Sequence, residues 1–308
     1  MTSSKGIQSK AVPFWVSNIT PEDREAVARS LASGYLTRGP EVEAFEAELC
    51  QVSGAKYAVC VSSGTTALML ACRSLDTETV VVHDGTFRGV VNAIRWAGRT
   101  PVFVDSQPTG HSCIATTLHG RDWLNTASIS DQAHGPVTHL DALHKVSVLS
   151  FDYQKHVRSG EGGALLTNYG AQAQVYRHQR DNQGDGFNAR MPEMCAALGR
   201  SQFSRYETNR QARLRIARTY HAAMPTLCPP WQDDDAPLYY ACWHDEAPLI
   251  RYRLEKAGIE TRVHYPSISG LPEATKNAQR TFSLPLYPEL TDEQIAYVIS
   301  QTQEAMRG

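Results

Sequence analysis

The sequence lacks the features that mark membrane, secreted and nucleic-acid-binding proteins. No apolar run approaches the roughly 20 residues that a membrane-spanning helix needs, and residues 1–10 show no apolar stretch of the kind found in a signal peptide. Lysine and arginine form no cluster, and the formal net charge is -2. Nucleic acid and anionic membranes are therefore poor candidates for the main partner, and we expect a cytoplasmic protein.

Spacings typical of metal sites and disulfide frameworks are also missing. The seven cysteines are odd in number and include no C-x-x-C pair, and the eleven histidines show neither H-x-x-x-H nor H-E-x-x-H spacing. The sequence therefore offers no support for a metal site. Because most of the cysteines lie within apolar runs, we expect them to be reduced residues of the core.

What the sequence does contain is an alternation of helices with short uncharged strands. Of its 308 residues, 42% are hydrophobic and 20% charged, as in an ordinary globular protein. Thr-Pro-Glu-Asp at 20–23 is typical of a helix start, and a second helix is expected from about Pro40. Strands are expected at 57–61, 80–82, 102–104, 146–149 and 164–167. This alternation predicts an α/β fold whose largely parallel sheet is covered on both faces.

The C-terminal third has a different pattern. The chain turns helical from about Met191 to Arg218, and a smaller α/β region follows from about Leu227. Near the end, Thr291 and Gln294 have the spacing of a capping box ahead of an apolar helix. We therefore expect a large domain at 1–218 and a small C-terminal domain at 219–308.

Residues 62–65, Ser-Ser-Gly-Thr, join a buried strand to a helix. Such a turn presents free backbone N–H groups, hydroxyls and the positive end of a helix dipole, which together suit a phosphate group. An ordinary helix cap has the same composition, so this segment by itself leaves a purely structural role open.

A lysine follows the next candidate strand. Lys155 comes shortly after Ser150 and precedes Gly-Glu-Gly-Gly at 160–163. It is either a surface lysine in a hairpin-like connection or an amine shielded in a pocket, where a lowered pKa makes it a nucleophile. The neighbouring glycines would let the backbone approach a cofactor closely.

Asp131 lies at the end of another short strand. It is either a turn or cap residue, or an acid that pairs with the protonated ring nitrogen of a pyridine cofactor.

Together these segments resemble the DegT/DnrJ/StrS family of pyridoxal-phosphate (PLP) dependent sugar aminotransferases, which share the aspartate aminotransferase fold, fold type I. The resemblance runs from about Pro13 to Glu304. It implies a large domain with a mostly parallel, seven-stranded type of sheet between helices, and a small C-terminal α/β domain. The ordered matches lie at 33–40, 45–46, 62–65, 85–87, 92–94, 101–105, 150–163, 186–191, 258–261, 264–266 and 284–288.

The resemblance also implies a role for each matching residue. Lys155 forms the Schiff base with PLP, and Lys155 and Asp131 are the catalytic pair. The residues implied to bind the cofactor contact its phosphate, ring face, ring nitrogen and phenolic oxygen. They are Ser63, Gly64, Thr65, Phe87, Asp131, His134, Ser150, Lys155 and Asn188. The substrate side comprises Thr37, Arg190, His264 and Tyr265. For Phe87 core packing stays open, and for His264 a buried structural role stays open.

The family pattern places Asn188 at the phosphate of the neighbouring subunit, which implies a homodimer with shared active sites. Two departures stand out. Between Asp105 and Asp131 the chain lacks a strand with a Val-His motif and its following helix, with 116–128 as a brief replacement, and this affects substrate recognition. A related sugar dehydratase has histidine in place of the lysine, and His156 is adjacent, but the step from Ser150 selects Lys155.

The predicted activity is therefore amino transfer from glutamate or glutamine to a keto-sugar, nucleotide-linked, in amino-sugar or secondary-metabolite biosynthesis. Two alternatives stay open at this point. One is a PLP-dependent sugar dehydratase or deoxygenase, and the other is a non-catalytic partner subunit with the same fold.

Overall fold

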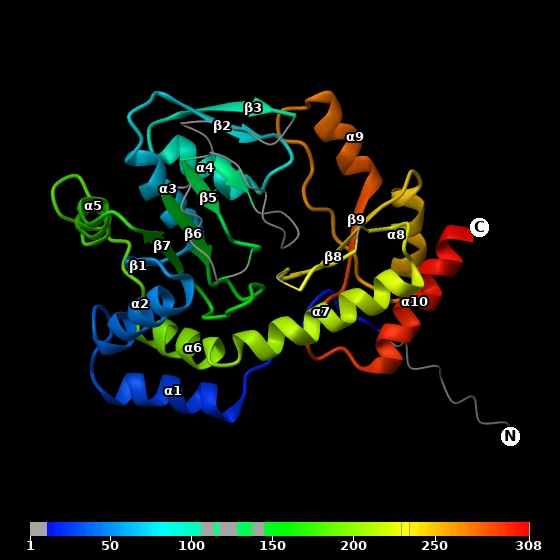
Figure 1. Ribbon diagram of the computed structural model, residues 1–308, viewed down its shortest axis with the longest axis horizontal. Coiled ribbons are helices and arrows are strands. Elements are labelled where there is room, and N and C mark those ends of the chain that lie inside the picture. The colour runs from blue at the N-terminus through cyan, green and yellow to red at the C-terminus, as the bar shows by residue number, and fades with distance from the viewer. Residues whose placement is uncertain are drawn as a thin grey trace, which may run out of the picture.

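The computed structural model describes residues 11–105, 114–116, 128–135, 137, 145–228, 230–233 and 235–307 (Figure 1). Segments 1–10 and 117–127 and Cys113 lie outside the described residues, as do the predictions that fall on them. Six cysteines are described, and all six are free thiols. No helix within the described ranges is both long and apolar enough to cross a bilayer.

The first two helices begin where the sequence predicts. Helix α1 (Pro21–Ala32) starts with a capping box, in which the Thr20 hydroxyl and the Asp23 carboxylate each accept from the other residue's backbone N–H. Helix α2 (Pro40–Ser53) buries Val42, Phe45 and Leu49 on one side. Both helices begin at a proline, whose missing N–H costs nothing in the first turn.

The central sheet has five strands in the order β1-β7-β6-β5-β4. Their bounds are β1 (Tyr57–Val61), β4 (Ile114–Thr116), β5 (Ile129–Asp131), β6 (Val146–Ser150) and β7 (Gly163–Thr167). Strand β7 is antiparallel to both of its neighbours, whereas β4, β5 and β6 are parallel. Strands β2 (Thr79–His83) and β3 (Thr100–Val104) form a separate parallel pair. The described strands therefore divide as five and two, and a single continuous seven-stranded sheet is not seen among them.

Helices cover both faces of this sheet, as the uncharged strands predict. Val148 and Leu165 pack into a cluster with α3 (Gly64–Arg73), α4 (Arg88–Trp96) and α5 (Gly170–Arg180). The next residues along β6 and β7, Leu149 and Leu166, pack on the opposite side with α2 and α6 (Glu193–Phe203). Alternate side chains of a strand point to opposite faces, so a strand buried on both faces must be apolar throughout.

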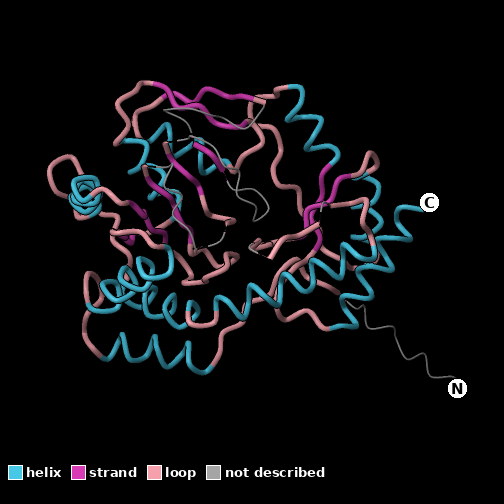
Figure 2. The backbone as a smooth tube through the Cα atoms, viewed as in Figure 1, coloured by secondary structure: helices cyan, strands magenta, loops and turns pink. Residues whose placement is uncertain are grey.

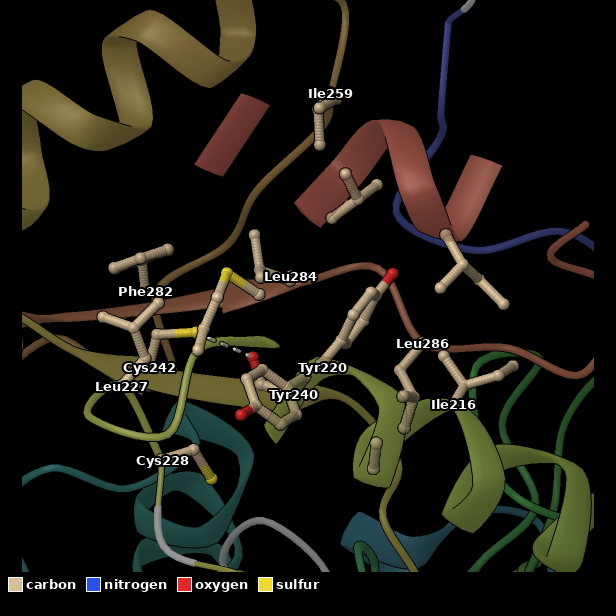
Figure 3. Packing of buried hydrophobic residues seen from close by; sticks show 14 of the residues in the cluster. Ile216, Tyr220, Leu227, Cys228, Tyr240, Cys242, Ile259, Phe282, Leu284 and Leu286 are labelled. Carbon is tan, nitrogen blue, oxygen red and sulfur yellow. Dashed lines mark hydrogen bonds between the residues drawn. The ribbon is translucent and has the colours of Figure 1, made fainter. Parts of the chain in front are cut away.

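A long helix, α7 (Tyr206–Ala223), leads from the central sheet into the C-terminal part (Figure 1). There β8 (Tyr240–Trp243) and β9 (Thr281–Leu284) pair antiparallel beside α8 (Ala247–Lys256), α9 (Pro272–Arg280) and α10 (Asp292–Arg307). Figure 3 shows their shared core, in which Tyr220, Tyr240 and Phe282 are buried. The expected capping box forms between Thr291 and Gln294. A domain boundary at 218/219 stays a prediction; it would fall inside α7.

Loops leave the ends of the central strands toward the C-terminal strands (Figure 2). Asp131 and Ser150 end two of these strands, and Ser63 and Lys155 follow β1 and β6, so these candidate residues lie at the strand ends or just after them.

One buried carboxylate joins α6 to the start of α2. Glu193 is 1% exposed and accepts hydrogen bonds from the backbone N–H groups of Gly39, Glu41 and Val42 at 2.7, 2.8 and 3.1 Å. The first N–H groups of a helix have no acceptor within the helix, and the helix dipole favours a negative charge there. Glu193 therefore acts as the cap of α2, whose own N-cap residue, Gly39, has no side chain.

We predict that Glu193→Gln lowers the free energy of unfolding by about 2 kcal/mol. Glutamine keeps the shape of the side chain, but its NH₂ group replaces one acceptor oxygen and would face the backbone N–H groups of α2. Urea unfolding followed by tryptophan fluorescence measures the change. Glu43→Gln, at an exposed position of the same helix end, is the control and should cost only a few tenths of a kcal/mol. Equal stability of the two variants would contradict the capping role.

Candidate active site

A cavity of about 380 Å³ lies between the central sheet and the C-terminal part. Its size is in the range of small-molecule sites. It brings together ten of the residues singled out from the sequence, which come from segments far apart in the chain: Ser63, Gly64, Thr65, Phe87, Asp131, His134, Ser150, Lys155, His264 and Tyr265.

The turn at 62–65 contributes Ser63, Gly64 and Thr65 to the lining of this cavity. Ser63 is the N-cap of α3, and its hydroxyl accepts from the backbone N–H of Thr66 at 3.1 Å. The turn is packed tightly: a Cβ atom on Gly64 would lie 2.7 Å from the Cβ atom of Ser150, and one on Gly163 would lie 2.5 Å from the carbonyl carbon of Ser63. The turn thus places the helix N-terminus beside the Ser150 side chain, an arrangement that suits a phosphate.

Lys155 lines the cavity on the loop between β6 and β7. Burial is the main influence on its amine and lowers the pKa, while the charges of Asp131 and Asp152 act in the opposite direction. An amine with a lowered pKa is more often neutral and can act as a nucleophile. The adjacent His156 is buried elsewhere, with its ring 6.0 Å from that of Tyr206, and is not among the residues lining the cavity.

Asp131 lies at the end of β5 and is 3% exposed. Burial raises the pKa of its carboxyl group to about 6, against a hydrogen bond from the Ala133 backbone N–H and the charge of Lys155, which lower it. The Asp131 carboxylate forms no ion pair within the described ranges. Its desolvated charge would be stabilised by a cation, and a protonated ring nitrogen is such a cation.

His134 is held between two tyrosines. Its Nδ1 atom lies 2.9 Å from the Tyr239 hydroxyl, and its Nε2 atom lies 3.0 Å from the Tyr265 hydroxyl. His264 stacks on Tyr239 with ring centroids 3.9 Å apart. The sequence indicated His134, His264 and Tyr265 but not Tyr239, because a tyrosine next to an apolar strand, here just before β8, has the pattern of a core residue.

Phe87 is the N-cap of α4 and lines the cavity while staying 51% exposed. Its ring centroid is 5.8 Å from that of Tyr265. Packing in the protein core is therefore not its role, and an exposed ring at a cavity wall is available to a flat ligand.

Three further candidates lie away from this cavity. Thr37 is exposed and forms a backbone bridge to Pro192, and Asn188 is exposed and bridges to Asp181. Arg190 lines a separate hollow beside α2 and α5. Within one chain they do not meet Lys155, so their proposed roles stay predictions.

The cavity wall also contains residues to which the sequence assigned no role of their own, although Tyr153, Arg158 and Tyr287 fall in segments that match the family. They come mainly from the N-terminal segment, the lysine loop, α7 and the segments before β8 and after β9, and include Phe14, Trp15, Tyr153, Arg158, Arg213, Leu238 and Tyr287. Only the fold brings these side chains to the cavity.

Comparisons with known proteins agree with this geometry. A model of the DegT/DnrJ/EryC1/StrS aminotransferase family matches residues 17–118 and 127–303. GDP-perosamine synthase of Escherichia coli O157:H7 is 25% identical, over 96% of this chain and 98% of that protein. PseC of Helicobacter pylori, an aminotransferase involved in the biosynthesis of pseudoaminic acid, superposes with a TM-score of 0.87 at 22% identity, covering 96% of this chain and 99% of that one. The PLP form of a putative sugar aminotransferase, Spr1654 of Streptococcus pneumoniae, gives 0.84 at 21% identity, covering 96% and 98%. These likenesses confirm the predicted fold.

The raised pKa of Asp131 predicts a pH-dependent cost to stability. Its stabilising contribution is complete below the ordinary pKa of 3.8 and is lost as the pH rises through about 6. Asp131→Asn mimics the protonated carboxyl. Its free energy of unfolding should therefore rise by about 2 kcal/mol relative to that of the wild type as the pH goes from 4.5 to 7.5. Unfolding of the ligand-free protein at both pH values tests this, with the exposed Asp76→Asn as the surface control. If the difference in free energy of unfolding between Asp131→Asn and the wild type stays constant from pH 4.5 to 7.5, the raised pKa of Asp131 is contradicted.

Proposed function

Since the chain belongs to the DegT/DnrJ/EryC1/StrS aminotransferase family, we propose that the cavity around Lys155 is its active site. The enzyme is a PLP-dependent aminotransferase. The observation that supports this location is the convergence of Lys155, Asp131 and the 62–65 turn, from three separate segments, on one cavity.

The residues present fit PLP. The 62–65 turn and Ser150 offer an anion cradle in which a Cβ atom on Gly64 or Gly163 has no room. In the same cavity, Asp131 is a buried carboxylate suited to a ring nitrogen, and Lys155 provides an amine for the aldehyde. Phe87 offers an exposed ring face for stacking, and His134, held by its two tyrosines, would face the phenolic oxygen.

When bound, the cofactor supplies an aldehyde and an electron-withdrawing ring, through which an amino group passes from an amino acid to a ketone. Lys155 would hold the aldehyde, and its amine, shielded from water, would serve as the proton carrier beside the α-carbon of the donor. Asp131 would face the ring nitrogen and stabilise its proton, and so the negative charge that develops at the donor carbon. The 62–65 turn and Ser150 would hold the phosphate independently of the lysine.

We assign glutamate or glutamine as the donor and a nucleotide-linked keto-sugar as the acceptor. The overall reaction converts the donor into its 2-oxo acid and the ketone into an amine. The names of the relatives support a sugar acceptor, since one is a synthase of a GDP-linked sugar and another acts in the biosynthesis of pseudoaminic acid. A dehydratase with a histidine in place of the lysine is less well supported, because Lys155, and not His156, lines the cavity.

A homodimer with shared sites remains part of this proposal. Asn188 is exposed on the surface, outside the cavity of its own chain. A position of this kind is suited to reach the phosphate cradle of a second subunit. A cytoplasmic location likewise stays a prediction.

The first test concerns Lys155. Wild-type protein supplied with PLP should show the visible absorption band of a lysine-bound cofactor, and glutamate or glutamine should bleach it. Lys155→Ala should lack this band and lose at least about a thousandfold in amino-transfer rate, since it removes both the attachment point and the proton carrier. His156→Ala is the neighbouring control. If Lys155→Ala retained the same band, the assignment would fail.

The second test concerns the shared site. Asn188→Asp should repel the cofactor phosphate and inactivate the homodimer, as Lys155→Ala does. If Asn188 acts across the interface, co-expression of the two variants gives mixed dimers with one intact site, and about a quarter of the wild-type activity returns. If Asn188 acts within its own chain, or the protein is a monomer, no activity returns. Sedimentation of the purified mixture measures the oligomeric state.

A further inference from the structure

Two buried arginines in the wall of the cavity have no carboxylate partner among the residues that the structure describes. Arg213 of α7 is 2% exposed and Arg158 of the lysine loop is 6% exposed, and both line the cavity. The Nε atom of Arg213 is buried without an acceptor, and its guanidinium makes no hydrogen bond or ion pair with any described residue. Arg158 donates to the backbone carbonyl of Val16 at 3.0 Å, which leaves its charge unpaired. Burying an unpaired charge is costly, so this arrangement points to a missing anion.

The groups around this pair increase that cost. Burial, and then the charge of Arg158, lower the pKa of Arg213 to about 9, while Glu289 acts in the opposite direction. No ion pair joins Glu289 to either arginine among the described residues, and the Glu289 Oε2 atom is itself buried without a hydrogen-bond partner. The Tyr287 hydroxyl, at the cavity wall, is also buried without a partner. An anion between the two arginines would satisfy the guanidinium donors and the hydroxyl together.

The chemistry of the site favours a carboxylate. A guanidinium presents paired N–H donors that match the two oxygens of a carboxylate or of a phosphate. The cofactor phosphate already has its own place at the 62–65 turn. The diphosphate of a nucleotide-linked sugar lies in the middle of a long molecule, whereas these arginines are almost completely buried. A carboxylate at the end of a small molecule fits such a position better.

We propose that Arg158 and Arg213, assisted by the Tyr287 hydroxyl, bind a carboxylate of the amino donor. This rests on the proposed function, because it assumes that an amino acid enters the cavity. Arg158 stands on the same loop as Lys155, so the group that recognises the donor and the group that accepts its amine are positioned by one segment. The class of donor that the site selects is then an amino acid with a dicarboxylate or monocarboxylate skeleton, rather than a simple amine.

The test measures binding directly, with glutarate as the probe. Titration calorimetry of the PLP-loaded enzyme should show that glutarate binds and that glutamate competes with it. Arg213→Met keeps the apolar stem but removes the charge, and should weaken glutarate binding by at least about tenfold, the loss expected for one charge-assisted hydrogen bond. The KM for the donor should rise with it, while the absorption band of the loaded enzyme and the KM for the acceptor stay unchanged.

The matched control is Arg215→Met, on the same helix two residues further along. The Arg215 side chain is 57% exposed and pairs with Asp292 at the surface, so its loss should leave glutarate binding unchanged. If Arg213→Met fails to fold, Arg213→Lys keeps a charge in place but loses the paired donors, and should still weaken glutarate binding. Arg158→Met provides an independent reading of the same site.

Three results would overturn the proposal. The first is a wild-type enzyme that does not bind glutarate, and the second is unchanged glutarate affinity in Arg213→Lys and Arg158→Met. The third is loss of affinity for a nucleoside diphosphate in these variants with glutarate binding intact, which would assign the arginines to the acceptor. Glutarate binding that depends on Arg213, in a protein whose band no amino acid bleaches, would support the anion site and reject the proposed function. If an amino acid bleaches the band but the variants keep the wild-type affinity for the donor, the proposed function stands and the anion site is rejected.

Discussion

The active cavity depends on the strand pairing around Gly163. This residue begins β7 and is paired on one side with Val61, the last residue of β1, and on the other with Ser150, the last residue of β6. The 62–65 turn follows Val61, and the lysine loop follows Ser150, so the two segments that carry the proposed site leave the sheet side by side. A Cβ atom on Gly163 would lie 2.5 Å from the carbonyl carbon of Ser63, so any larger residue would push the turn away.

The cavity gathers charges that water no longer stabilises. Burial lowers the pKa of the Lys155 amine and raises that of the Asp131 carboxyl, so both shifts favour the neutral forms. Arg158 and Arg213 add two cations that no described carboxylate balances. Such a site is costly to the empty protein and becomes favourable when ligands supply the opposite charges, which couples ligand binding to stability. The same desolvation strengthens each electrostatic contact with a bound substrate.

The parts of this site that could be predicted from sequence are those whose chemistry is local. The 62–65 turn, Lys155 with its glycine loop, and Asp131 at a strand end each have a recognisable neighbourhood within a few residues. Tyr239 and Arg213 have no such signal, because one stands just before an apolar strand and the other in a helix rich in arginine. Their position depends on how α7 and β8 pack against the sheet. The antiparallel course of β7 was equally hidden, since a strand buried on both faces is apolar in either direction.

The position of Asp131 shows why a short connection before it is compatible with catalysis. Its backbone is paired with Val148 of β6 on one side and with Thr116 of β4 on the other, both in parallel register. These two strand neighbours fix the Asp131 backbone at the end of β5. We therefore expect the carboxylate to keep its place as long as both pairings form, whatever the number of residues between β4 and β5. The residues that the proposed function assigns to the cofactor lie at strand ends or just after them, so their arrangement depends on strand pairing rather than on the length of this connection.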